Sequence, residues 1–264
     1  MNNAIETIEH NGYTISLYQD EDCSSPRDND WNFLFLGLPH RHYNIGDETI
    51  DVSDFKLPCT SGLVYHEDCT ECYGDGERVP SNLSELCDAI QAHYKARVCL
   101  PVGMIDHSGV SYYIGGGAHW SDSAGWDSGT CGFILDTPDI IRERYGDADL
   151  GYIQDLTDDM LVSAMTAEIA EYSSWAEGDC YGYVIEDVNG ETVDSCWGFI
   201  GYEYAKREAL DACPDTPVEP LIPVRMTRAQ WETTLTALDI RRMVHPITSN
   251  DPTESMAIIQ EALK

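Results

Sequence analysis

Three cysteines and one histidine in the first third of the chain are the residues best suited to hold a metal ion: Cys59, His66, Cys69 and Cys72. The Cys69-x-x-Cys72 spacing brings two thiolates to one ion, and His66 could complete the set with Cys59. Zinc prefers this combination of sulfur and nitrogen ligands. The competing interpretation is a loop with incidental cysteines, because no second CxxC pair accompanies the first. We expect no other cofactor.

A second group of residues could bind a hard cation or transfer protons: His107, Asp127 and Asp194. Carboxylates and imidazoles serve both purposes, in a metal-dependent enzyme or in a metal-binding accessory protein. No catalytic motif organises them, since the sequence lacks a G-x-S-x-G elbow, a phosphate-binding loop and an H-E-x-x-H helix. Loop residues of these types more often form turns and helix caps, so catalysis is the less favoured interpretation.

The charge of the chain is its most informative property. It has 47 acidic and 15 basic side chains and a net charge of −32. Residues 221–264 hold five of each sign, which leaves 42 acidic and 10 basic side chains in residues 1–220. Salt adaptation would acidify the whole surface, so this uneven distribution favours a local cause, namely a basic partner. The lack of a basic patch argues against direct binding to DNA, RNA or anionic lipid.

The acidic residues predicted to meet such a partner come from a loop near the N-terminus and from residues 147–171. They are Asp20, Glu21, Asp22, Asp28, Asp30, Asp147, Asp149, Asp155, Asp158, Asp159, Glu168 and Glu171. The last four are expected to lie off the apolar stripe of a helix at 158–175. An ordinary solvated surface is the competing interpretation, because that is what runs of charge usually form.

The sequence also bears on where the protein works. No apolar run approaches the roughly 18 residues of a membrane span, and the first residues lack the basic and apolar parts of a secretory signal. We therefore expect the protein in the cytoplasm of the cell that makes it. Because reducing cytoplasm disfavours disulfides, its ten cysteines are expected to be mostly buried free thiols, Cys196 among them.

The residue patterns predict an α+β fold with a mixed or antiparallel sheet and flanking helices. Alternating or apolar runs predict strands at 13–18, 31–38, 100–105, 110–114 and 132–135. Capping residues and helical periodicity predict helices at 82–97, 137–146, 158–175 and 202–212. Asn189-Gly190 separates two β-rich runs and predicts a hairpin with a type I′ turn near 181–200.

Several short motifs occur in a fixed order along the chain. They are DEDxxSPR at 20–27, RxYNxGD at 41–47, DHSGV at 106–110, WDSG at 126–129, GDxYGxxxED at 178–187 and DSCWGF at 194–199. In this order they resemble a family of uncharacterised proteins encoded by bacteriophages, prophages and plasmids. The resemblance covers roughly residues 14–212. It implies a mobile-element origin and expression inside a bacterial or archaeal host, but no activity.

The departures from that family suggest how the chain is divided. Residues 1–213 are predicted to form an acidic α+β main domain in which residues 51–99, with the CxxC pair, are an insertion. Four prolines at 214–223 predict a stiff linker. Residues 224–264 are predicted to form a small, charge-balanced α/β subdomain.

Together these patterns favour a phage-type anti-defence protein. Its acidic surface would imitate nucleic acid and bind a host nucleic-acid-binding protein, such as a restriction enzyme or a CRISPR-type complex. The first alternative is the metal-dependent enzyme or metal-binding accessory protein that uses His107, Asp127 and Asp194. A passive accessory protein of a salt-rich host is a further one.

Overall fold

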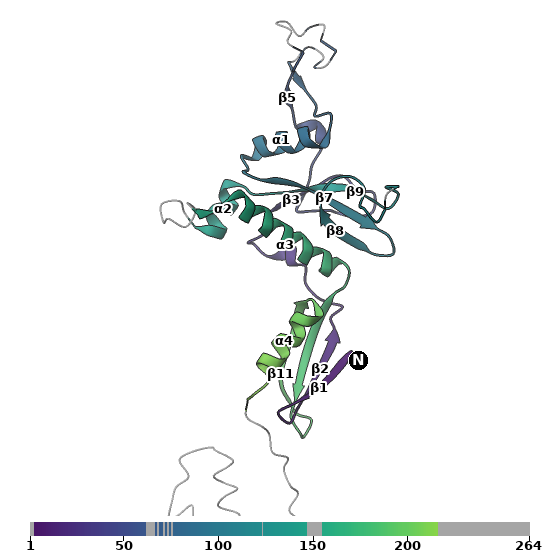
Figure 1. The fold of residues 1–264 in the computed structure, drawn as a ribbon, viewed down its shortest axis with the longest axis vertical. Helices are drawn as coiled ribbons and strands as arrows, with labels where there is room; N and C mark the ends of the chain where they lie inside the picture. Colours follow the sequence, from purple (N-terminus) through teal and green to yellow (C-terminus); the bar gives the residue numbers. More distant parts are fainter. Residues whose placement is uncertain are drawn as a thin grey trace, which may run out of the picture. The chain divides into compact units, whose positions relative to one another are not determined.

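The computed structural model of the chain describes residues 3–61, 67, 69–70, 72, 74, 76–122, 124–146 and 155–215. The chain divides into two units after residue 218, and residues 219–264 lie outside the described part. The predicted subdomain at 224–264 falls there, as does the predicted linker at 214–223 apart from Pro214 and Asp215. Within the first unit, helices and mixed and antiparallel sheets confirm the α+β fold (Figure 1).

A four-stranded antiparallel sheet has the strand order β1-β2-β10-β11. Its strands are β1 (Glu6–His10), β2 (Tyr13–Gln19), β10 (Cys180–Glu186) and β11 (Thr192–Ile200). Helix α4 (Tyr202–Ala212) covers one face, where Ile15, Leu17 and Ile185 pack against Ala205 and Ala209. The alternation in residues 13–18 places every second side chain on that face, as the sequence predicts.

The two hairpins of this sheet use the same dipeptide in different ways. Asn11 and Gly12 have φ values of 52° and 81° and form the two-residue type I′ turn between β1 and β2. The hairpin at 181–200 is confirmed, but its predicted type I′ turn is wrong. Asn189 is outside the left-handed region, and the Asp187 carboxylate accepts hydrogen bonds from the backbone N–H groups of Asn189 and Glu191. That carboxylate therefore selects a longer turn.

A five-stranded mixed sheet has the strand order β4-β3-β9-β7-β8, with β3 and β4 parallel and the other pairs antiparallel. Its strands are β3 (Leu34–Gly37), β4 (Glu48–Thr49), β7 (Cys99–Asp106), β8 (Val110–Ile114) and β9 (Ser128–Leu135). The hairpin of β5 (Leu57–Pro58) and β6 (Glu77–Arg78) is a separate two-stranded sheet. The 3-10 turns η1 (Pro26–Asp28) and η2 (Val52–Asp54) complete the connections.

Helices cover both faces of the five-stranded sheet (Figure 1). Helix α3 (Asp158–Ala176) packs on one face together with α2 (Pro138–Tyr145), and α1 (Leu83–Tyr94) packs on the other. Successive residues of β9 pack into the cores on opposite faces of the sheet: Ile134 faces α3, whereas Phe133 faces α1. Asn82, Thr137 and Thr157 are the N-caps of α1, α2 and α3, because the side chain of each accepts a backbone hydrogen bond from its own first turn.

Arg27, the last residue of the DEDxxSPR motif, is the hub of a buried ion network. Its guanidinium forms ion pairs with Asp47 and Glu168, and its side chain is 9% exposed. It also donates a hydrogen bond of 2.7 Å to the carbonyl oxygen of Phe33. The Asp47 carboxylate in turn accepts from the backbone N–H of Phe35 at 2.8 Å. One side chain therefore ties the N-terminal loop to strand β3 and to helix α3.

Glu168 completes the network from helix α3. Its carboxylate accepts from the backbone N–H of Phe33 at 3.0 Å and pairs with Arg144 of α2 at 2.9 Å. The Arg144 guanidinium lies 4.3 Å from the centroid of the Phe33 ring. Glu168 is only 9% exposed, so its predicted place on an acidic binding surface is wrong. A buried carboxylate is stable there because two guanidinium groups and a backbone donor surround it.

Two further sequence predictions are wrong because the side chains concerned are exposed to solvent. Trp31 was expected inside a buried strand, but strand β3 begins at Leu34 and the Trp31 side chain is 64% exposed. Cys196 was expected to be a packed core thiol, yet it is exposed on β11, which is the edge strand of its sheet. All ten cysteines are free in the structure.

The ion network predicts an unequal response to the loss of two arginines. Replacing Arg27 by Met should lower the free energy of unfolding by about 3 kcal/mol, because it leaves two carboxylates without their shared buried cation. Arg142 is the matched control, since its pair with Asp139 is largely exposed, and Arg142→Met should cost less than about 0.5 kcal/mol. Urea unfolding measures both, and equal losses would contradict a structural role for the network.

Candidate functional site

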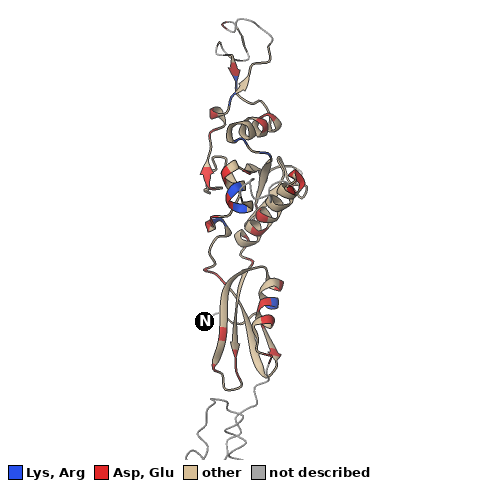
Figure 2. Cartoon of the chain, turned by 90° about the vertical axis from the view of Figure 1, so that its left-hand side faces the viewer, with Lys and Arg blue, Asp and Glu red and all other residues tan. Residues whose placement is uncertain are grey.

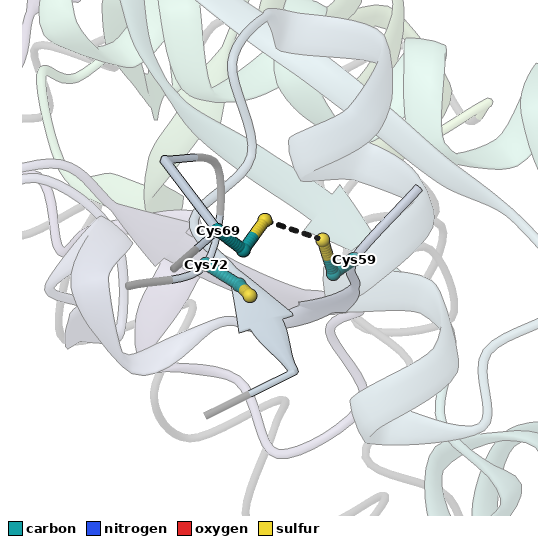
Figure 3. A group of neighbouring side chains, drawn as sticks. All are labelled: Cys59, Cys69 and Cys72. Carbon is teal, nitrogen blue, oxygen red and sulfur yellow. Dashed lines mark hydrogen bonds between the residues drawn. The ribbon is translucent and has the colours of Figure 1, made fainter. Parts of the chain in front are cut away.

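The cysteine cluster lies at the end of the two-stranded sheet. Cys59 directly follows β5, and Cys69 and Cys72 precede β6. The backbone N–H of Cys59 donates to the carbonyl oxygen of Gly76 at 2.9 Å, which extends the hairpin to the first cysteine. The three sulfur atoms lie within 4.8 Å of one another and face a common space (Figure 3). His66, the predicted fourth ligand, is outside the described residues.

The geometry of the cluster suits a metal ion. The Sγ atoms of Cys59 and Cys69 are 3.5 Å apart, longer than the roughly 2.05 Å of a disulfide bond. Two thiolates bound to one tetrahedral zinc ion, each at about 2.3 Å, are separated by roughly 3.8 Å. Cys69 and Cys72 are buried, 5% and 3% exposed, so solvent contributes little to stabilising negative charge on them. The cluster could therefore hold a metal ion that prefers sulfur ligands.

The surroundings of Cys59 also affect its protonation. A hydrogen bond to Ser61 lowers the pKa of the Cys59 thiol, but desolvation and the neighbouring thiols of Cys69 and Cys72 outweigh it and raise that pKa overall. Three thiolates so close together repel one another unless a cation lies between them. A metal ion removes this repulsion and releases the protons.

Glu85 connects this hairpin to helix α1. Its carboxylate forms two hydrogen bonds with the guanidinium of Arg78 on β6, at 2.6 and 2.8 Å. It also accepts from the backbone N–H and the hydroxyl of Ser81, both at 2.8 Å. Its own N–H donates to the side chain of Asn82, the N-cap of α1. The cluster is therefore anchored to the rest of the unit through β6.

The second predicted group is brought together only in part. His107 Nδ1 and Asp127 Oδ2 are 2.9 Å apart in loops at one end of the five-stranded sheet. The backbone holds the pair, because the N–H of Asp106 donates to the carbonyl oxygen of Asp127 at 2.7 Å. Asp194 belongs to the four-stranded sheet instead, where it accepts from the hydroxyl of Tyr183 at 3.2 Å. Burial and Asp194 raise the pKa of Tyr183 to about 12.

A polar cleft of about 380 Å³ lies beside Asp127. Three motif segments that are distant in the sequence line it: His40, Arg41 and His42, then Asp106, then Trp126 to Cys131. Near it, Tyr43 stacks on His40 with ring centroids 5.2 Å apart and donates to Asp106 at 3.3 Å. Sequence reasoning did not place Asp106, Tyr43 or Trp126 in a site, although all three belong to the ordered motifs. Within the described residues, the cysteines alone form a group with metal-ligand spacing.

The predicted acidic residues occupy separate segments and differ in their surroundings. Asp22, Asp28 and Asp30 are exposed in the loop after β2, and Asp155, Asp159 and Glu171 are exposed in or near α3. Glu21 is exposed as well. Asp20 accepts from the backbone N–H groups of Asp22 and Gly198, and Asp158 pairs with Arg97 at 2.6 Å. Asp147 and Asp149 lie outside the described residues. Figure 2 shows Asp and Glu on many elements rather than along a single row.

Comparison of the chain with protein-family models, with curated proteins and with solved structures finds no significant match to any of them. The resemblance to phage and plasmid proteins therefore stays a prediction. None of the helices in the described ranges has the length and apolar character needed to cross a bilayer.

The Glu85 contacts predict an unusual titration. Arg78 first, and then Ser81, lower the pKa of Glu85 to about 2. Because the folded pKa is depressed, the stabilisation is fully present above the ordinary value of 4.5 and is lost only as the pH falls through about 2. Carboxyl chemical shifts in an NMR titration should give a Glu85 midpoint near pH 2 that moves upward in Arg78→Met. A midpoint near 4.5 in the unmodified protein would refute these contacts.

Proposed function

We propose that this protein is an anti-defence inhibitor that binds a basic, nucleic-acid-binding surface of a host effector, such as a restriction enzyme or a CRISPR-type complex. The supporting observation is how the chain uses its few cations. Seven of the ten basic side chains in residues 1–220 form ion pairs with carboxylates of the same fold. The surface is therefore left with an excess of negative charge that the protein itself does not neutralise.

The distribution of that charge defines how the inhibitor would act. Because the carboxylates lie on many elements, they create a broad negative field rather than one row that copies a nucleic-acid backbone (Figure 2). Such a field speeds the encounter with a positive channel and weakens as salt shortens the Debye length to about 8 Å at physiological ionic strength. Short-range contacts must then fix the position of the bound inhibitor.

This proposal predicts a salt-sensitive and competitive interaction. Immobilised protein should retain an identifiable nucleic-acid-handling effector from host lysate at low ionic strength, and both molar salt and added DNA should release it. Displacement by DNA is the decisive result, because it shows that the inhibitor occupies the nucleic-acid channel. Recovery of no such effector at low salt, or retention that DNA does not affect, would overturn the proposal.

A second proposal concerns the cysteine cluster, which we infer holds a zinc ion with a structural role. Its support is the close approach of three sulfur atoms at the end of a very short hairpin. With two residues in each strand, β5 and β6 form too small a sheet to be stable alone. When bound, zinc would supply cross-links between the two sides of the hairpin, with Cys59 on one side and Cys69 and Cys72 on the other.

The zinc proposal predicts a stoichiometric metal that depends on the cluster. Protein made in zinc-supplemented medium should contain about one zinc per chain, and Cys69→Ser should lose most of it. The exposed thiol of Cys196 is the matched control, and Cys196→Ser should keep the metal. Cobalt substitution should give a sulfur-to-cobalt charge-transfer band, and a change of the d–d bands in His66→Ala tests the fourth ligand. Zinc-free protein with no cobalt band would contradict the proposal.

A further inference from the structure

The four-stranded sheet has a second face, opposite helix α4, that carries a groove of about 860 Å³. Its lining combines apolar side chains of the sheet with carboxylates of the following loop. The lining residues used below are Tyr18, Val184, Trp197, Asp20, Glu21 and Asp22. No residue of α4 contributes to it. The groove is therefore a surface that the packing of α4 leaves uncovered.

Backbone features place the aromatic ring of Trp197 in this groove. Gly182 lies beneath it, and a Cβ atom at that position would approach the Trp197 ring to 2.2 Å. Gly198 follows with φ of +86°, a conformation that other residues rarely adopt, and its N–H donates to Asp20 Oδ2 at 3.0 Å. Phe199, one residue further on, packs with the α4 core instead. The turn of the chain at Gly198 thus directs Trp197 toward Tyr18 and the acidic loop.

The groove has the chemistry of a site for a cationic side chain. The rings of Trp197 and Tyr18 lie with centroids 5.9 Å apart, and Trp197 is 48% exposed. Aromatic faces attract cations, and the planar guanidinium group of arginine can stack on a ring while donating hydrogen bonds to carboxylates. Carboxylates of residues 20–22 lie at the same groove. A lysine ammonium group lacks the planar shape that stacking requires.

The edge of the sheet is a less suitable binding site for a partner segment than the groove. Strand β11 is an edge strand and could in principle pair with an extended peptide. Two of its backbone N–H groups are already bonded to carboxylates, however: Ser195 to Asp194 at 2.8 Å and Gly198 to Asp20 at 3.0 Å. These contacts interrupt the row of donors that strand addition needs. Recognition by side chains in the groove is therefore favoured over extension of the sheet.

We propose that this groove binds an arginine side chain from a basic segment of the partner protein. Charge complementarity selects that occupant, because the groove is acidic and most of the chain's own cations in residues 1–220 are engaged in internal ion pairs. The proposal rests on the proposed inhibitory function and supplies the short-range contact that a diffuse negative field lacks. The rings of Trp197 and Tyr18 would stack on the guanidinium group, and the carboxylates would attract its positive charge.

Binding of short peptides tests the groove directly. Octa-arginine should bind the full chain several-fold more tightly than octa-lysine, and its binding should quench tryptophan fluorescence. Trp197→Leu should weaken octa-arginine binding roughly tenfold and remove the preference over lysine, since it removes the ring on which the guanidinium group would stack. Trp120→Leu is the matched control and should leave binding unchanged, because Trp120 is 87% exposed in the loop before β9 and lines neither this groove nor the polar cleft.

Further variants separate the groove from general electrostatics and from misfolding. The pair Asp22→Asn and Glu21→Gln should weaken octa-arginine binding more than the pair Asp28→Asn and Asp30→Asn, which removes the same charge from the same loop. Circular dichroism and thermal unfolding establish that Trp197→Leu is folded. Equal binding of the two peptides, or equal weakening by both charge pairs, would overturn the proposal. Dissociation of a homodimer by Trp197→Leu would also overturn it, because a second copy would then occupy the groove.

The lysate experiment keeps the two proposals distinguishable. If Trp197→Leu retains a host effector as well as the unmodified protein does, the inhibitory function stands and the groove proposal fails. If the unmodified protein captures no effector but octa-arginine binding depends on Trp197, the groove is real and the anti-defence function fails.

Discussion

The buried guanidinium of Arg27 is the interaction on which the organisation of the first unit depends. It compensates Asp47 and Glu168, and through Phe33 it fixes the approach to strand β3. A buried carboxylate costs several kcal/mol unless donors surround it, and Arg27 is one of the donors around Glu168, which is 9% exposed. The network therefore specifies one arrangement of the N-terminal loop, the central strand and helix α3, rather than merely adding to their stability.

This constraint also explains why so acidic a chain can fold. Net charge of one sign destabilises a compact state by self-repulsion. The chain opposes this by placing its few cations where they contact carboxylates at short range, as Arg78 does with Glu85 and Lys206 does with Glu6. An ion pair removes one charge of each sign, so it leaves the net charge unchanged. The excess negative charge therefore follows from the composition of residues 1–220, with 42 acidic and 10 basic side chains.

Local structure was predictable wherever one residue decides it. The capping residues Asn82, Thr137 and Thr157 bond backbone donors within their own turn, so their neighbours in sequence are their partners in space. The turn at Asn189-Gly190 was not predictable from that dipeptide alone, because the carboxylate of Asp187 competes for the same backbone groups. Asn11-Gly12 forms the type I′ turn that this dipeptide favours.

The burial of single side chains and the contacts between distant segments were less predictable, although the sequence contained some signals of both. Glu168 lies seven residues after Leu161 and three after Met165, which places it on the buried stripe of α3, and only the assumption that acids face solvent concealed this. Asp194 could not be separated from His107 and Asp127 by sequence, because nothing local shows that they belong to different sheets. The cysteine spacing did identify three residues that the fold brings together.

Each candidate site can be described by the positive charge that would balance its negative groups, because residues 1–220 contain few cations. The ion network satisfies its carboxylates with arginines from within the chain. At the cysteine cluster, a hydrogen bond to Ser61 lowers the pKa of the Cys59 thiol, but desolvation and the neighbouring thiols raise it overall. A metal ion would supply the counter-charge for three clustered thiolates. At the groove beside Trp197, the carboxylates of residues 20–22 and the two aromatic rings together suit a planar cation. Each of the two proposed sites is thus a place where a cation from outside the chain would supply the counter-charge, and both binding proposals rest on that electrostatic argument.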